Sequence, residues 1–167
     1  RIICIVMMNK EIVMLLNIRG SNKSTRTLVN YAAWWYAEKL MGKRLMSALE
    51  INIKLDRTLY KKSNMKGSAI WEDEGRRPRE FTIKLDSTMS IRDILITLAH
   101  EMVHVKQWAK DEMYDYYNTP KMVRFKGEKM HYDEVDYWDY PWEIEAYGRE
   151  MGLFIRFCDY MKIEENI

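Results

Sequence analysis

The chain has 167 residues, a length that fits one domain with a buried core. Hydrophobic residues make up 47% of it, charged residues 31% and aromatic residues 13%, which excludes a disordered, charge-dominated chain. The formal net charge of +2 is too small to indicate a nucleic-acid-binding protein by itself. Cys4 and Cys158 form no C-x-x-C pair, so neither a thiolate zinc site nor a disulfide framework is predicted.

The most apolar stretch lies at the N-terminus. Lys10 and Glu11 interrupt residues 1–18, which are therefore a poor membrane helix, and no small-residue cleavage site follows them. We expect no membrane association and a cytoplasmic protein. The sequence divides into an N-terminal segment at residues 1–24, a domain at residues 25–160 and a tail at residues 161–167.

The first predicted helix follows the polar segment 21–25. Apolar residues recur at helical spacing from Leu28 to Leu40, and Gly42 is expected to end the helix. Residues 49–56 then alternate between apolar and polar side chains, which is the period of a half-buried strand. We find no internal repeat along the chain.

Two further strands are predicted at residues 68–72 and 81–86. The polar segment between them contains Gly75 and Pro78 and is typical of a hairpin loop. Three arginines lie within residues 76–79 of this loop. Because acidic residues flank them, we interpret the loop as a solvated tip, with a phosphate contact as the alternative.

A long helix is predicted from Ser90 to about Met113, since Ser90 and Asp93 form a capping-box-like pair ahead of apolar residues at helical spacing. Residues 121–140 are expected to be mostly loop. Pro141 suits the first position of a final helix. The buried stripe of that helix is predicted to contain Ile144, Tyr147, Met151, Phe154, Ile155 and Cys158.

The long helix carries the motif H-E-x-x-H at residues 100–104. Two histidines four residues apart lie on the same side of a helix, so His100 and His104 can bind one zinc ion. Glu101 is then placed to act as general base on a metal-activated water. The alternative is a pair of histidines on a solvated helix face.

A catalytic zinc site usually has three protein ligands. The extended motif H-E-x-x-H-x-x-G-x-x-H is excluded, because Gln107 and Lys110 occupy its Gly and third His positions. The final helix offers Glu143, which borders the apolar stripe, and Glu145, which points away from it. We therefore predict Glu143 as the third ligand, with the small Ala146 allowing the two helices to approach.

Other residues could complete the site. His131 is a rival third ligand, or a hydrogen-bond donor to a developing oxyanion. Tyr132, Tyr137 and Tyr140 could play the same catalytic role, and we name Tyr140 together with His131 as candidates.

The predicted strand before the metal helix has a candidate function of its own. An exposed strand edge can pair with an extended peptide, so Ala69, Ile70 and Trp71 are candidate substrate-binding residues. A plain sheet strand is the alternative.

Two segments resemble known metallopeptidases. Residues 100–104 resemble the H-E-M-(I/V)-H helix of SprT-like metallopeptidases, and residues 143–146 resemble the E-x-E-A third-ligand helix of minimal gluzincins, including the ImmA/IrrE group. Residues 141–150 are similar to phage-encoded proteins described as metallopeptidases. The resemblance spans roughly residues 25–160 and implies a zincin-like fold, one zinc ion and hydrolysis of peptide bonds. It departs from the SprT pattern at His131, which does not lie in a G-H-G segment.

The order of elements predicts an α+β, zincin-like single domain. A small, mainly antiparallel sheet is expected to pack with the N-terminal helix, the motif helix and a C-terminal ligand helix. The predicted function is a zinc metallopeptidase of the gluzincin type acting on a protein or peptide. A non-catalytic, zinc-stabilised binding domain and a SprT-like, DNA-associated protease are the alternatives.

Overall fold

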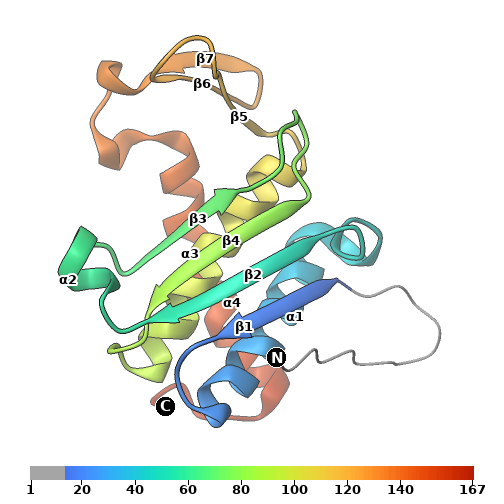
Figure 1. Cartoon of the computed structure of the whole chain (residues 1–167). Coiled ribbons are helices and arrows are strands. Elements are labelled where there is room, and N and C mark those ends of the chain that lie inside the picture. The colour runs from blue at the N-terminus through green and yellow to red at the C-terminus, as the bar shows by residue number, and fades with distance from the viewer. Residues whose placement is uncertain (1–13) are drawn as a thin grey trace.

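The computed structural model describes residues 14–167, so most of the predicted N-terminal segment lies outside the described residues. The elements fall into a helix-covered sheet followed by a small second sheet and a final helix (Figure 1). In chain order they are β1 (Leu15–Arg19), α1 (Lys23–Met46), β2 (Glu50–Asp56), α2 (Leu59–Ser63), β3 (Gly67–Trp71), β4 (Glu80–Asp86), α3 (Ile91–Ala109), β5 (Met113–Asp115), β6 (Met122–Phe125), β7 (Glu128–His131), two single 3-10 turns, η1 (Tyr132–Glu134) and η2 (Tyr137–Asp139), and α4 (Pro141–Met161).

The α+β class is confirmed, but the expectation of a mainly antiparallel sheet is wrong. The main sheet has the order β1-β2-β4-β3, in which β1 pairs parallel with β2, β2 pairs parallel with β4, and β3 pairs antiparallel with β4. The hairpin between β3 and β4 is present as predicted. Strands β1 and β2 are parallel because α1 connects them as a crossover, and the predictions contained no strand before that helix. Strands β2 and β4 are parallel because α2 and β3 lie between them in the chain.

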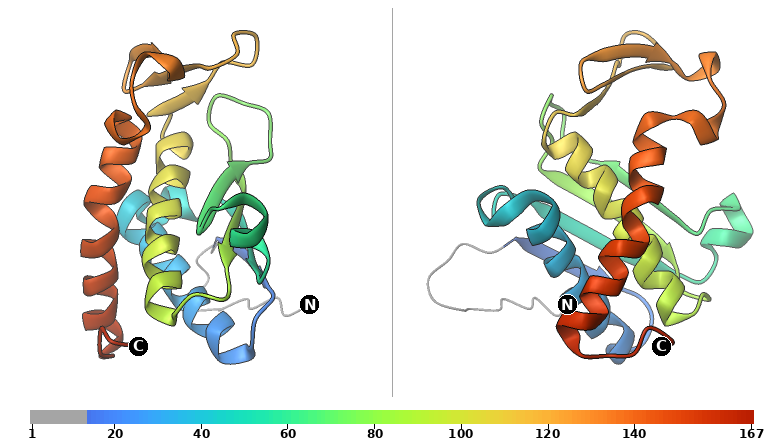
Figure 2. Two further views of the ribbon diagram at one scale, coloured as in Figure 1. Left: turned by 90° about the vertical axis from the view of Figure 1, so that its left-hand side faces the viewer. Right: turned by 180° about the vertical axis from the view of Figure 1, so that it is seen from behind.

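The core lies between one face of the main sheet and the helices α1, α3 and α4 (Figure 2). Alternate residues of β2 and β4 point into it, as the period of two predicts. These inward side chains are at most 5% exposed, and each contributes roughly 1.5–3 kcal/mol on burial. They are Ile51, Ile53, Leu55, Phe81, Ile83 and Leu85.

Helix α3 ends at Ala109, four residues before the predicted end. Asp111, with a φ of 60°, turns the chain away from the helix. Its carboxylate accepts hydrogen bonds from Arg76 and Arg124, which fixes the turn. The arginine-containing loop therefore packs on the end of α3, where Arg79 also donates to the Ala109 carbonyl oxygen at 2.9 Å.

Helix α1 continues past the predicted end. Gly42 has a φ of 76° and interrupts the helical geometry, but the element extends to Met46. The region predicted to be loop at residues 121–140 instead contains a hairpin and two 3-10 turns. Strands β6 and β7 are joined by Lys126 and Gly127, whose φ values of 48° and 95° suit a two-residue hairpin turn. The alternation on these strands is only four residues long, so it gave a weak signal.

The predicted stripe of α4 is wrong in its first half. Ile144, Tyr147 and Met151 are 56%, 42% and 40% exposed, whereas Phe154 and Cys158 are buried as expected. The first turns of α4 face polar side chains of α3, so the buried face there carries Glu143 and Ala146 instead. Among the described residues, no helix combines the length and apolar character needed to cross a membrane.

Candidate metal centre

Helix α3 presents both histidines of the motif toward α4. The side chain of Ser90 caps this helix by accepting a hydrogen bond from the Asp93 backbone N–H. His100 and His104 lie one turn apart, and their Nε2 atoms are 3.1 Å from each other. Each histidine is only 8% exposed. The alternative of a histidine pair on a solvated helix face is therefore excluded, because α4 covers that side of α3.

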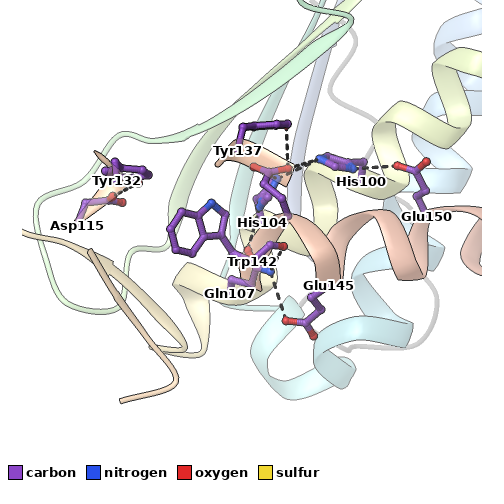
Figure 3. A network of polar contacts seen from close by, with 10 residues as sticks. His100, His104, Gln107, Asp115, Tyr132, Tyr137, Trp142, Glu145 and Glu150 are labelled. Atoms are coloured by element: carbon purple, nitrogen blue, oxygen red, sulfur yellow. Dashed lines mark hydrogen bonds and ion pairs between the residues drawn. The ribbon is translucent and has the colours of Figure 1, made fainter. Parts of the chain in front are cut away.

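Helix α4 brings a carboxylate to the same point. Figure 3 shows the two histidines with Tyr137, Gln107 and Glu150 around them. Glu143 Oε2 lies 3.3 Å from His100 Nε2, and Glu143 Oε1 lies 3.5 Å from His104 Nε2. Ala146, one turn along α4, is fully buried between the helices. One ligand atom from each of the three residues fits within 4.8 Å of the other two, so His100, His104 and Glu143 could hold a metal ion.

Each histidine is oriented by a hydrogen bond at its other ring nitrogen. His100 Nδ1 lies 2.9 Å from Glu150 Oε2, and His104 Nδ1 lies 2.9 Å from Gln107 Oε1. A protonated Nδ1 in each ring leaves both Nε2 atoms free to bind the same ion. Gln107 is itself held by donating to the Trp142 carbonyl oxygen at 2.9 Å. The donor set and its outer partners therefore fit a metal site.

The charges of the cluster are strongly coupled. Burial lowers the pKa of His100, but hydrogen bonds to Glu143 and Glu150 outweigh it and raise that pKa to about 9. Burial raises the pKa of Glu143, but hydrogen bonds to His100 and His104 lower it to about 2. The carboxylate therefore stays ionised, which is the form that binds a cation.

Glu101 is buried beside the metal cluster and the edge strand β3. It is 6% exposed, and its carboxylate accepts a hydrogen bond from the backbone N–H of Ala69. Burial raises the pKa of Glu101. Gly67 makes room for this side chain, because a Cβ there would lie 2.9 Å from Glu101 Oε1 and 2.5 Å from Thr97 Cγ2.

A cleft of about 470 Å³ opens directly on His100 and Glu101. Tyr137, in η2, lines the cleft and donates a hydrogen bond to Glu143 Oε2 at 3.0 Å. Burial, with further contributions from Tyr147 and Glu143, raises the pKa of Tyr137, so its hydroxyl remains a hydrogen-bond donor. Further lining residues come from α2, the connection between α2 and β3, α3 and α4: Tyr60, Met65, Ile96, Thr97 and Tyr147.

Two predicted catalytic residues lie away from the cluster. His131 ends β7, where its Nδ1 accepts from the Asp133 backbone N–H at 3.3 Å. Tyr140 donates to the Tyr132 carbonyl oxygen at 2.7 Å and stacks on Trp142. His131 and Tyr140 therefore help to shape the turns before α4, and neither lines the cleft or belongs to the metal-binding group.

The alternative ligand Glu145 also lies outside the cluster. Its carboxylate accepts a hydrogen bond from Lys106 Nζ at 2.7 Å and one from Arg149 Nε at 3.0 Å. The predicted substrate-binding residues Ala69, Ile70 and Trp71 all belong to β3, at the end of the main sheet.

Several residues of the site were not predicted. Gln107 lies three residues after His104, and Glu150 lies seven residues after Glu143, so both spacings place them on the faces that carry the motif. Helical periodicity could therefore have found them. Tyr137 was considered but not selected, because the fold of the segment before α4 could not be read from the sequence.

No protein-family model matches this sequence, and no curated protein and no solved structure is significantly similar to it.

Proposed function

We propose that the chain is a zinc-dependent metallopeptidase of the gluzincin type. One observation carries the proposal: a buried His100–His104–Glu143 group lies beside Glu101, and the cleft opens on this same place. A site with two histidines, one glutamate and a neighbouring general base is the arrangement used by zinc peptidases.

In this proposal His100, His104 and Glu143 hold the zinc ion. When bound, zinc supplies a Lewis acid that polarises a peptide carbonyl and makes water more acidic. Glu101 accepts the proton of the attacking water and returns it to the leaving amine. The raised pKa of Glu101 suits a group that must take up and release a proton during the reaction.

The free edge of β3 supports binding of an extended peptide. Hydrogen bonds from Glu72 N to Glu80 O and from Asp86 N to Lys66 O show that even-numbered residues of this region pair with β4. Because pairing alternates along an antiparallel strand, the backbone groups of Gly67, Ala69 and Trp71 face the open edge. A substrate strand could pair with Gly67, Trp71 and the Ala69 carbonyl oxygen next to Glu101, since the Ala69 N–H already donates to the Glu101 carboxylate.

Tyr137 is the proposed oxyanion donor. It lines the cleft and already donates to Glu143, so its hydroxyl lies next to the metal-binding group. A donor in this position can stabilise the negative charge that develops on the substrate carbonyl oxygen.

The test compares zinc-loaded wild type, Glu101→Gln and the control Glu128→Gln, whose side chain is exposed on β7. Unfolded proteins serve as substrates, and mass spectrometry quantifies the new N-termini. Loss of a general base should lower cleavage by about 10²- to 10⁴-fold in Glu101→Gln, with zinc content unchanged. Equal cleavage by wild type and Glu101→Gln would exclude the proposed mechanism.

A non-catalytic zinc domain is the second candidate, because the same cluster joins α3 to α4. In that case, Glu101→Gln would leave every property unchanged, whereas His100→Ala would lower stability and any partner binding. The DNA-associated alternative has less support, since Arg76 is paired with Asp111 and Arg79 is hydrogen-bonded to Ala109.

A further inference from the structure

The second face of the main sheet is not covered by any helix of the described chain. Helices α1, α3 and α4 all lie on the opposite face (Figure 2). Parallel strands are usually covered on both faces in proteins. The open face is separate from the cleft, because the cleft is lined by residues of α2, α3, α4 and the start of β3 and by none of β2 or β4.

The expectation that the chain has no internal repeat is wrong, because strands β2 and β4 carry a short one. Residues 50–58 read EINIKLDRT and residues 80–88 read EFTIKLDST, which share Glu, Ile, Lys, Leu, Asp and Thr at the same places. The two copies pair in parallel without an offset, so that Glu50 lies beside Glu80 and Lys54 beside Lys84. The open face therefore presents a glutamate, a neutral polar residue and a lysine twice, in the same order.

This pairing arranges the open face in three rows that cross the strands. The acidic row contains Glu50, Glu80 and Glu72. The neutral row contains Asn17, Asn52 and Thr82, and it borders a hollow of about 220 Å³. The basic row contains Arg19, Lys54 and Lys84.

Rows of like charge are unfavourable within a single sheet, because side chains directly opposite each other on neighbouring strands repel. None of the six charged side chains in the acidic and basic rows forms a salt bridge with another residue of the described chain. Opposite charges supplied from outside would remove this repulsion.

We propose that a second copy of this chain packs against the open face, related by a two-fold axis that runs along the neutral row. Such an axis makes the strands of the two copies antiparallel across the interface, and it places each strand opposite its own equivalent. Glu50 then faces Lys54 of the other copy, Glu80 faces the other copy's Lys84, and Asn52 faces its own equivalent. Because a two-fold contact is formed twice, four charge pairs result.

The charge and size of the face distinguish this partner from others. Acidic residues lie on both sides of the basic row, since the acidic row lies on one side and Asp56, which follows Lys54 on the same strand, lies on the other. A nucleic acid would be repelled by them. Strands about 4.8 Å apart with a rise of about 3.3 Å per residue give a face of roughly 400 Å². This is below the roughly 800 Å² per partner of a stable interface, so the dimer is weak.

The test is sedimentation equilibrium of the zinc-supplied full chain at increasing protein concentration and at two salt concentrations. We expect the dimer fraction to rise as the protein concentration is increased toward about 1 mM in low salt. The dimer fraction should be smaller in about 0.5 M salt, because exposed charge pairs are screened. Lys54→Glu plus Lys84→Glu should abolish association by placing acidic groups opposite Glu50 and Glu80. Lys110→Glu plus Arg156→Glu, with the same change in charge away from the sheet, should associate as wild type.

A four-residue exchange makes the test specific. Glu50→Lys, Lys54→Glu, Glu80→Lys and Lys84→Glu in one chain keep the net charge and invert both rows, so association should return. Circular dichroism identifies any variant that does not fold, and the wild-type concentration and salt series remains decisive in that case. A monomeric wild type, association that is insensitive to salt, or a folded four-residue variant that stays monomeric would overturn the proposal. Binding of an oligonucleotide by a monomeric chain would do the same and assign the basic row to nucleic acid.

Discussion

Glu143 and Glu145 lie two residues apart on α4, and their surroundings differ. The carboxylate of Glu143 faces His100 and His104, with nitrogen–oxygen distances of 3.3 and 3.5 Å. The carboxylate of Glu145 faces the ammonium group of Lys106 at 2.7 Å. Imidazole nitrogens carry lone pairs that bind metals, whereas an ammonium group carries none. The chemistry of the partner therefore separates a candidate metal ligand from an ion-pair centre.

The pKa values alone do not make this distinction. Burial raises the pKa of Glu143, and its histidine partners lower it to about 2. Burial also raises the pKa of Glu145, and hydrogen bonds from Lys106 and Gln107 lower it to about 2. Gln107 contacts both regions, because it donates to Glu145 at 3.3 Å and accepts from His104. The ion-pair region around Glu145 thus helps to hold His104 of the metal-binding group.

The largest difference is expected between Glu143→Gln and Glu145→Gln in zinc affinity. Glu143→Gln should weaken zinc binding by more than about 100-fold, since loss of an outer partner alone costs 10- to 100-fold. Glu145→Gln should weaken it by less than about 10-fold, because Gln107 keeps its bond to Trp142. Competition with a chelating dye measures both constants. A larger loss in Glu145→Gln would reverse the assignment of the ligand.

A smaller effect on zinc affinity is expected at Gln107, which contacts both His104 and Glu145. Gln107→Leu leaves His104 Nδ1 without an acceptor and should lower zinc affinity by roughly 10- to 100-fold. Gln107→Glu retains an acceptor oxygen and serves as the matched control. Wild-type affinity in Gln107→Leu would show that His104 needs no such support.

Tyr137→Phe should affect catalysis rather than metal binding. We expect kcat for peptide cleavage to fall by about 10-fold, less than for a buried oxyanion donor, because Tyr137 is 45% exposed. Zinc affinity should stay within about twofold, since Tyr137 is not one of the ligands. An unchanged kcat would leave Tyr137 with a packing role only.

The smallest effect concerns acid stability. The pKa of Glu145 is lower in the folded chain than in the unfolded chain, so its stabilising effect is complete above about pH 4.5 and is lost as pH falls toward 2. The difference in unfolding free energy between wild type and Glu145→Gln should therefore shrink over this range. Urea denaturation at several pH values measures it. A difference that is constant with pH would contradict the ion-pair role.

The sequence predicted elements with strong periodicity and missed those defined by tertiary context. The strand at residues 49–56 and the helix beginning after Ser90 were predicted because their periods are clear. The face of α4 was misread, since burial of Glu143 against histidines breaks the apolar pattern that defines a stripe. Strand β1 and the β6–β7 hairpin are short, and pairing with neighbours decides their structure.

The candidate site shows the same division. The structure brings together His100, His104 and Glu143, which spacing had selected. It leaves out His131, which lies at the end of β7. That strand is only four residues long, so its sequence pattern was too short to indicate where the His131 side chain would lie. The repeat in β2 and β4 was visible in the sequence, but its meaning depends on parallel pairing without an offset.

Zinc content per chain tests the central claim most directly. Elemental analysis of purified, zinc-supplied wild type should give about one zinc per chain, because three ligands and one open position define a single site. His104→Ala, which removes one ligand of the cluster, should give close to none. Wild type without zinc, or equal zinc in both proteins, would contradict the assignment of a metal centre to His100, His104 and Glu143.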